Sequence, residues 1–234
     1  MGLRDWFRGS KKTTTILPTD IVVFIVGPSG SGKSRVKMTP ILFLATAYSA
    51  FICTPLQFMS ILLQNANVHV KVGKGQRPGT TEVHAERCQF NGMQSDIVIV
   101  DTPSFCTYMK LDGEKVVRKW MESNYTEPCK MATMLYMHNL AFNPEDTNLR
   151  VSNHLGVFQR TCRQNLFPSI IHVVPTLSTG AKLSKERLRT STAQLQHQAD
   201  AVGARLHSTF DGKPETAWDV VQGLLNVQEM GKQG

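Results

Sequence analysis

The sequence predicts an α/β fold of three layers, in which helices flank a mainly parallel central sheet. Continuous apolar runs at residues 20–26 and 96–100 are typical of strands buried on both faces of a parallel sheet. These and later strand patterns alternate with amphipathic helical patterns, and such alternation indicates βαβ units. A chain of 234 residues is long enough to bury one sizeable core of this kind.

The elements follow from hydrophobic spacing and from residues that start or stop helices. Strands are predicted at residues 20–26, 87–90, 96–101, 131–140 and 169–174. Helices are predicted at residues 114–123, 151–164, 185–206 and 215–226. Asn148 and Ser152 are the two candidates for the cap of the second helix, because their side chains can accept a hydrogen bond from the first turn.

The strands and helices form one predicted domain over residues 20–226, between a basic arm at 1–19 and a tail at 227–234. Five cysteines without a C-x-x-C pair indicate a reducing compartment rather than a disulfide framework, so a cytoplasmic protein is expected. The net charge of +8 favours a polyanionic partner, such as a nucleotide, a nucleic acid or an anionic membrane. No aromatic–basic RNA-binding motif is present, so we expect the chain to bind no specific nucleic acid. Contact of the basic arm with a membrane is a hypothesis that the sequence favours less than an arm without a ligand.

Residues 27–34 read Gly-Pro-Ser-Gly-Ser-Gly-Lys-Ser and fit the pattern G-x-x-x-x-G-K-[ST] completely, directly after the first strand. Glycines let the backbone wrap a phosphate closely, and the next helix offers its positive N-terminal end to the same anion. Lys33 is expected to reach the β- and γ-phosphates, and the Ser34 hydroxyl to ligate Mg²⁺. The motif makes the predicted fold that of a P-loop NTPase.

Two further segments complete the predicted site. Asp101 ends an apolar strand and can hold Mg²⁺. The Gly-rich basic segment 71–83 is a candidate switch loop in which Thr80, with Thr81 as the next candidate, meets Mg²⁺ and the γ-phosphate; the alternative is that these are ordinary loop residues. The predicted catalytic residues are Lys33 and Thr80, and the predicted metal ligands are Ser34, Thr80 and Asp101. The predicted nucleotide-binding residues are Gly27, Pro28, Ser29, Gly30, Ser31, Gly32, Lys33, Ser34, Arg35 and Ser104. His138 ends a predicted strand on the nucleotide side and has either a structural role or a contact with the base or a partner.

With these residues in place, the chain resembles the septin-like and immune-associated (AIG) TRAFAC G domains, and most of all small G-domain proteins of mushroom-forming fungi. The matching stretches lie at residues 25–34, 80–83, 98–105 and 134–138, with looser matches at 169–176 and 217–221. The resemblance implies GTP and Mg²⁺ as cofactors, slow phosphoanhydride hydrolysis, and a homodimer formed through the nucleotide face.

Three positions depart from that family. The pattern Asp-x-x-Gly ends in Ser104 here, which puts γ-phosphate sensing in doubt, and Phe105 stands where a water-orienting Gln is expected. No Asn/Thr-Lys-x-Asp follows the strand at 169–174, because residues 174–178 read Val-Pro-Thr-Leu-Ser. Guanine preference therefore rests on the resemblance alone, and ATP is not excluded.

Two alternative functions stay open beside a slowly hydrolysing GTP-binding NTPase. The first is a pseudo-GTPase that binds nucleotide as an interaction module, in line with the three departures. The second is a small-molecule kinase, for which Arg187 and Arg189 are the only candidates for an arginine-bearing lid.

The segment 36–57 is an unusual apolar insertion without a charged residue after Lys37. Three hypotheses are open for this segment: a buried helix broken near Pro55, a membrane span, or the translation of a retained intron. The third is motivated by the family, in which a stretch like residue 35 continues directly into a stretch like residue 58.

Overall fold

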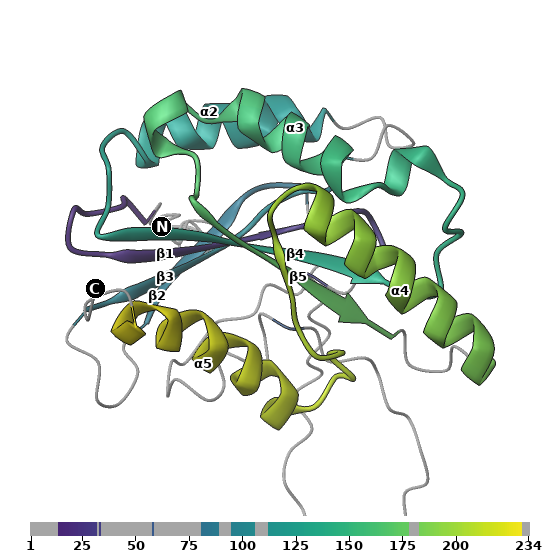
Figure 1. The fold of residues 1–234 in the computed structure, drawn as a ribbon. Helices are drawn as coiled ribbons and strands as arrows, with labels where there is room; N and C mark the ends of the chain where they lie inside the picture. The colour runs from purple at the N-terminus through teal and green to yellow at the C-terminus, as the bar shows by residue number, and fades with distance from the viewer. Residues whose placement is uncertain are drawn as a thin grey trace, which may run out of the picture.

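The computed structural model describes residues 14–31, 33, 58, 81–88, 95–105, 112–177 and 183–230. Within them a six-stranded sheet forms the centre of the molecule (Figure 1). Its strands are β1 Ile21–Val26, β2 His84–Cys88, β3 Ile97–Asp101, β4 Met131–Asn139, β5 Ile170–Thr176 and β6 Arg205–Leu206. The helices are α2 Gly113–Asn124, α3 Val151–Thr161, α4 Lys185–Ala201 and α5 Pro214–Met230, with short 3-10 turns η2 Thr147–Leu149 and η3 Gln164–Leu166.

The sheet has the strand order β2-β3-β1-β4-β5-β6. Every neighbouring pair is parallel except β2 with β3, so β1 lies between two parallel partners. Ile25 lies in register with Asp101 on β3 and with Leu135 on β4. The carboxyl ends of β1, β3, β4 and β5 therefore meet at one edge of the sheet, which is where ligands bind in open α/β folds.

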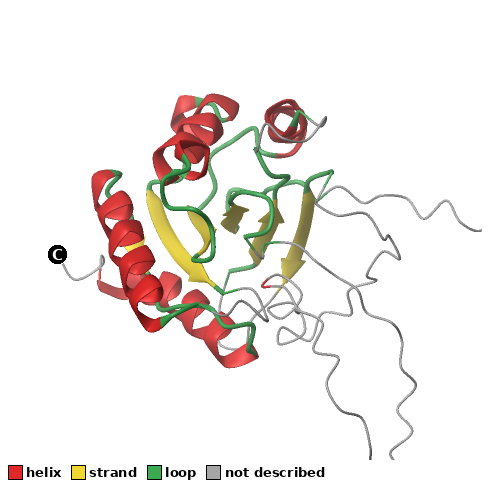
Figure 2. Ribbon diagram, turned by 90° about the vertical axis from the view of Figure 1, so that its right-hand side faces the viewer, coloured by secondary structure: helices red, strands yellow, loops and turns green. Residues whose placement is uncertain are grey.

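Helices cover both faces of the sheet, as Figures 1 and 2 show. Alternate residues of β1 supply the two cores, because successive strand side chains point to opposite faces. Phe24 and its same-face neighbours pack with buried residues of α2, α3 and α4. Val23 and Ile25 pack on the other face with buried residues of α5 and with Phe58. The predicted three-layer α/β fold with a mainly parallel sheet is confirmed.

Several predicted boundaries are wrong: the helix expected at 151–164 ends at Thr161, and the helix expected at 215–226 extends to Met230. The strand expected at 87–90 begins earlier, at His84, and residues 89–90 lie outside the described part. The helix expected at 185–206 ends at Ala201, and residues 205–206 form β6 instead. The helix ends because Gly203 adopts a φ of +67°, which glycine tolerates, and the Ala204 N–H then bonds to the Ala199 carbonyl at 2.9 Å.

The predicted cap of α3 is also wrong. The N-cap position is Arg150, whose side chain makes no capping hydrogen bond, so neither Asn148 nor Ser152 fills this role. The Val151 N–H instead donates to Gln198 Oε1 of α4 at 3.1 Å. The first turn of α3 is thus satisfied by another helix, a contact that local sequence cannot indicate.

Residues 14–19 of the predicted arm lie against the sheet. The Thr14 hydroxyl donates to the Ala85 carbonyl at 2.9 Å, and the Ile16 N–H donates to the Asn124 carbonyl at 2.8 Å. In the described part of the chain no helix has the length and apolar character needed to cross a membrane. The apolar segment 36–57 lies outside the described residues, so its three readings stay predictions, as do the boundaries of the domain, arm and tail.

Replacement of Phe24 is expected to destabilise the fold strongly. Phe24 is fully buried, and its ring centroid lies 5.5 Å from that of Tyr125 and 5.3 Å from that of Phe158. We expect Phe24→Ala to lower the free energy of unfolding by about 3–5 kcal/mol in urea denaturation. Leu17→Ala, at a residue 44% exposed, is the control and should change it by about 0.5 kcal/mol or less. Equal effects of the two substitutions would contradict the assigned core.

Acid is expected to weaken the fold partly through His172. This side chain is 1% exposed and its Nδ1 lies 2.5 Å from His207 Nε2. Burial, with the nearby His207 and Arg205, lowers the pKa of His172 to about 4, whereas an unfolded histidine titrates near about 6.5. Between these values the unfolded chain binds more protons, so the free energy of unfolding falls as pH falls.

His172→Gln should therefore reduce the loss of unfolding free energy between about pH 7 and about pH 5, measured by urea denaturation at both values. An unchanged loss in this variant would show that His172 does not contribute.

Candidate functional site

The motif predicted to bind phosphate directly follows the carboxyl end of β1, where a P-loop connects a strand to a helix. Gly27 has a φ of +151°, and a Cβ placed there would lie 2.3 Å from the Met137 carbonyl oxygen of β4. Gly30 has a φ of +81°. Glycine is therefore required at 27 for both space and conformation, and at 30 for conformation.

Lys33 folds back onto this loop. Its Nζ donates to the Pro28 carbonyl at 2.8 Å, and the side chain is only 5% exposed. A buried ammonium group held against a glycine-rich turn is suited to an anionic ligand, because its charge has little water to screen it. The Ser31 hydroxyl of the same loop is buried and has no hydrogen-bond partner among the described residues, so the loop also retains a polar group suited to a phosphate oxygen.

Two strand ends hold the loop in place. Asn139, the last residue of β4, donates through Nδ2 to the Gly30 carbonyl at 3.1 Å. Thr176, the last residue of β5, donates through its hydroxyl to the Ser31 carbonyl at 2.8 Å. Carbonyl oxygens repel phosphate, and here those of residues 28, 30 and 31 are all engaged by side-chain donors. The loop is thus fixed in a form that favours anions.

Asp101 lies on the neighbouring strand at the same edge. It ends β3 and is 2% exposed, and the next residue is tied to β1, since the Thr102 hydroxyl donates to the Ile25 carbonyl at 2.9 Å. Ser104 follows at this edge and is half-buried. A carboxylate beside the P-loop fits the hard oxygen ligands that Mg²⁺ prefers. The described residues contain no group of three or more His, Cys, Asp or Glu placed to hold a metal.

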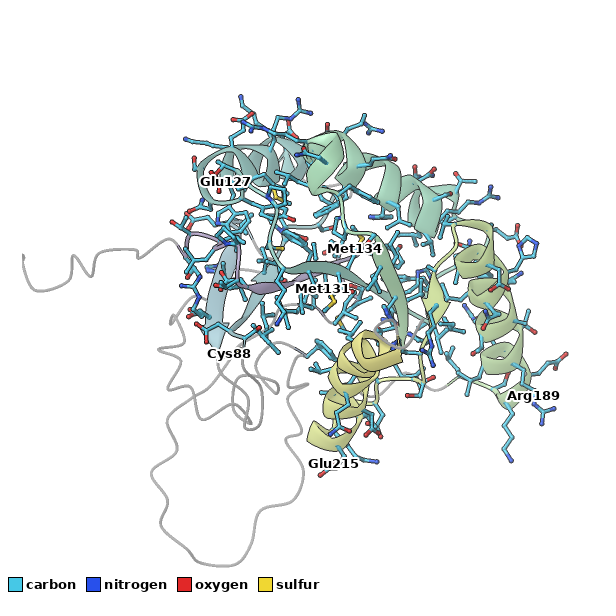
Figure 3. All side chains as sticks on the ribbon, turned by 60° about the vertical axis from the view of Figure 1, so that its left-hand side comes forward. Cys88, Glu127, Met131, Met134, Arg189 and Glu215 are labelled. Carbon is cyan, nitrogen blue, oxygen red and sulfur yellow. The ribbon has the colours of Figure 1, made fainter. Side chains whose placement is uncertain are left out.

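The structure therefore brings together most, but not all, of the predicted site. Gly27 to Ser31 and Lys33 follow the carboxyl end of β1, whereas Asp101 is the last residue of β3 and Ser104 comes shortly after it. Gly32, Ser34, Arg35 and Thr80 lie outside the described residues, so their predicted roles remain predictions. Arg187 and Arg189 are exposed on α4, and Figure 3 shows Arg189 pointing away from the sheet, as expected of a solvated helix face.

A histidine pair lies beside the loop. His138 on β4 is 9% exposed, and its ring packs edge-on against Phe142 with centroids 5.5 Å apart. Burial and the nearby His154 lower the pKa of His138 to about 4. Burial also lowers the pKa of His154 to about 4. Its 3.0 Å hydrogen bond with the Asn148 carbonyl acts in the opposite direction, and the nearby positive charge of Lys33 lowers the pKa further. Both rings are therefore neutral near neutral pH.

Sequence reasoning missed the residues that hold the loop. Asn139 lies inside the strand predicted at 131–140, Thr176 lies beyond the strand predicted at 169–174, and the sequence predicts no site role for either of them or for Phe142. The available signal was position, since a polar residue closing an apolar parallel strand lies at the ligand-binding edge. That signal identifies the edge of the sheet at which the residue lies but not the loop carbonyl to which it bonds, because both bonds join residues more than a hundred positions apart.

Comparison with known proteins gives no family assignment. No family model matches the chain, and no curated protein matches it. A dimerization-deficient mutant of Toc33 from Arabidopsis thaliana is similar in structure with 13% identity and a TM-score of 0.44, covering 80% of this chain and 69% of Toc33. Era, in a complex with MgGDPNP and a segment of 16S ribosomal RNA, is similar with 12% identity and a TM-score of 0.49, covering 90% of this chain and 57% of Era. At these values neither structure informs the activity of this chain.

The hydroxyl of Thr176 is expected to stabilise the loop measurably. Thr176→Val keeps the shape of the side chain but leaves the buried Ser31 carbonyl without this donor. We expect the free energy of unfolding to fall by about 1–3 kcal/mol in urea denaturation. Thr176→Ser, which retains the hydroxyl, should recover most of the loss. If the Val and Ser variants lose the same free energy of unfolding, the hydroxyl hydrogen bond does not stabilise the loop.

Proposed function

We propose that this chain binds a purine nucleoside triphosphate with Mg²⁺, GTP first and ATP as the alternative, and hydrolyses its terminal phosphoanhydride slowly. The observation that carries the proposal is the phosphate loop itself. Its glycines at 27 and 30 take up special backbone conformations, Lys33 lies against it, and donors from β4 and β5 hold its carbonyls. A Gly/Ser turn without a ligand has no need of a buried lysine.

Each group near the loop has a distinct task in this proposal. Lys33 neutralises charge on the β- and γ-phosphates, and the loop N–H groups surround the anion. Ser34, Thr80 and Asp101 hold Mg²⁺, which supplies positive charge to the terminal phosphates when bound. Asp101 ends β3, which is adjacent in the sheet to β1, the strand that precedes the phosphate loop. Hydrolysis is slow because no glutamine stands after Ser104 to orient the attacking water.

A second candidate, a nucleotide-binding interaction module without hydrolysis, is favoured by the position of Phe105. This ring packs into the core, with its centroid 6.2 Å from that of Phe158 on α3. The side chain is thus used for packing, and Ser104 stands where the family carries the γ-phosphate-sensing glycine. In either case we propose a homodimer through the nucleotide face, from the resemblance described above, and a cytoplasmic location, from the scattered cysteines.

The test is nucleotide binding by titration calorimetry with Mg²⁺, using GTP, GDP and ATP against wild type and Lys33→Ala. Losing a charge-assisted bond of about 1.5–3 kcal/mol should weaken triphosphate binding by about tenfold to about a hundredfold. Lys119→Ala, at an exposed lysine of α2, is the matched control and should bind as wild type does.

A measurement of phosphate release then separates the two candidate functions. Phosphate release from GTP or ATP by wild type, lost in Lys33→Ala, supports the slow NTPase, whereas binding without release supports the interaction module. If wild type binds no better than Lys33→Ala, the phosphate loop has no nucleotide function and the proposal is wrong.

A further inference from the structure

Two buried histidines pack together next to the phosphate loop. His138 lies near the end of β4 and is 9% exposed, and His154 lies on α3 and is 3% exposed. The ring of Tyr136 packs against both, with its centroid 6.1 Å from that of His138 and 5.5 Å from that of His154. Burial raises the pKa of the Tyr136 hydroxyl, so this side chain carries no charge. The two imidazoles thus belong to one packed cluster of uncharged rings.

The cluster is in contact with the phosphate loop at two points. A Cβ at Gly27 would lie 2.3 Å from the carbonyl oxygen of Met137, the residue before His138. Phe142 packs edge-on against His138 with ring centroids 5.5 Å apart, and a Cβ at Gly30 would lie 3.7 Å from the same Phe142 ring. The beginning and the turn of the loop are therefore packed against the segment that carries His138.

Each imidazole has a buried nitrogen that can accept a proton. Nδ1 of His138 and Nδ1 of His154 are buried and have no hydrogen-bond partner among the described residues. His154 Nε2 donates to the Asn148 carbonyl at 3.0 Å, so Nδ1 carries no proton in the neutral ring. Burial is the main reason why the pKa of each histidine is lowered to about 4, and the positive charge of Lys33 contributes to this for His154.

The elements around the pair also carry an acidic and a basic side chain. Asp146 lines a small recess beside His138, and its Oδ1 accepts from the Asn148 N–H at 3.0 Å. Arg150, at the start of α3, is exposed to water, which screens its charge. The side chains that α4 contributes to this recess are all neutral: Ser191, Gln194, Leu195 and Gln198. Of the charges near the pair, that of Lys33 is the one that a ligand in the loop neutralises.

A triphosphate in the loop reverses the electrostatic effect on the pair. Such a ligand keeps a net negative charge with Mg²⁺ bound, and this charge outweighs the single positive charge of Lys33. Lys33 is only 5% exposed, so water screens the interaction weakly. A nearby negative charge favours the protonated form of an imidazole. Because linkage is reciprocal, protonation of the pair then strengthens binding by the factor by which the ligand favours protonation.

We propose that the His138–His154 pair couples nucleotide binding to proton uptake: the pair is neutral in the free protein and takes up one proton when a triphosphate occupies the loop. The inference rests on the nucleotide binding proposed above and adds its regulation by pH. One proton is taken up rather than two, because adjacent imidazolium charges repel each other. The gain in affinity is absent near neutral pH and grows as pH falls, until the free pair itself protonates near about pH 4.

The first test is titration calorimetry with GTP and Mg²⁺ at about pH 7.5 and about pH 5, in buffers of different ionisation enthalpy, which together give the number of protons taken up. A pKa raised to about 5–6 in the bound state makes the affinity ratio between the two pH values about twofold to about tenfold larger for wild type than for the double variant His138→Gln/His154→Gln. This comparison cancels the protons bound by GTP itself. His197→Gln, at an exposed histidine of α4, is the matched control and should behave as wild type does.

The second test needs no variant and follows the ring C–H signals of His138 and His154 by NMR as pH is lowered. In the free protein both should titrate near about pH 4, and GTP with Mg²⁺ should move the titration of the pair to higher pH. Inorganic tripolyphosphate with Mg²⁺ should have the same effect, because the coupling comes from phosphate charge. An effect of GTP without one of bound tripolyphosphate would contradict this cause.

The outcomes separate this inference from the proposed function. Equal proton uptake by wild type and the double variant refutes the coupling, as does an NMR titration that GTP leaves unchanged. In both cases the proposed function stands, provided that Lys33→Ala loses binding. If wild type binds neither GTP nor tripolyphosphate at either pH, the proposed function fails and the coupling fails with it.

Discussion

The phosphate loop depends on the close approach of its first residue to β4. Any side chain at position 27 would place its Cβ 2.3 Å from the Met137 carbonyl, so only glycine lets the chain leave β1 in this direction. The bonds from Asn139 and Thr176 can form only once the loop has turned this way. Lys33 then reaches the Pro28 carbonyl across the same turn. The whole arrangement of donors around the loop follows from this one steric constraint.

The loop is consequently held directly against the sheet by hydrogen bonds. Its carbonyls bond to the terminal residues of β4 and β5, which are themselves paired, with Asn139 in register with Thr176. Asn139 also bonds to the segment that carries Phe142, because its Oδ1 accepts a hydrogen bond from the Ala141 N–H at 2.9 Å.

Burial decides the charge at this edge. The pKa values of His138 and His154 are lowered to about 4, so near neutral pH these rings add no charge to that of Lys33. The charge at this edge therefore depends on how deeply each side chain is packed, since burial disfavours the charged form of a histidine.

The sequence by itself determined the local features of this protein. The apolar runs of β1 and β3, the helical spacing of α2 and the glycine pattern of the phosphate loop are short-range signals, and each led to the element that the structure contains. Tertiary structure decided the rest: the Gln198 cap of α3, the pairing that makes residues 205–206 a strand, and the bond between Thr176 and Ser31, 145 residues apart. Such contacts depend on which elements pack together, and residue spacing along the chain carries no information about that choice.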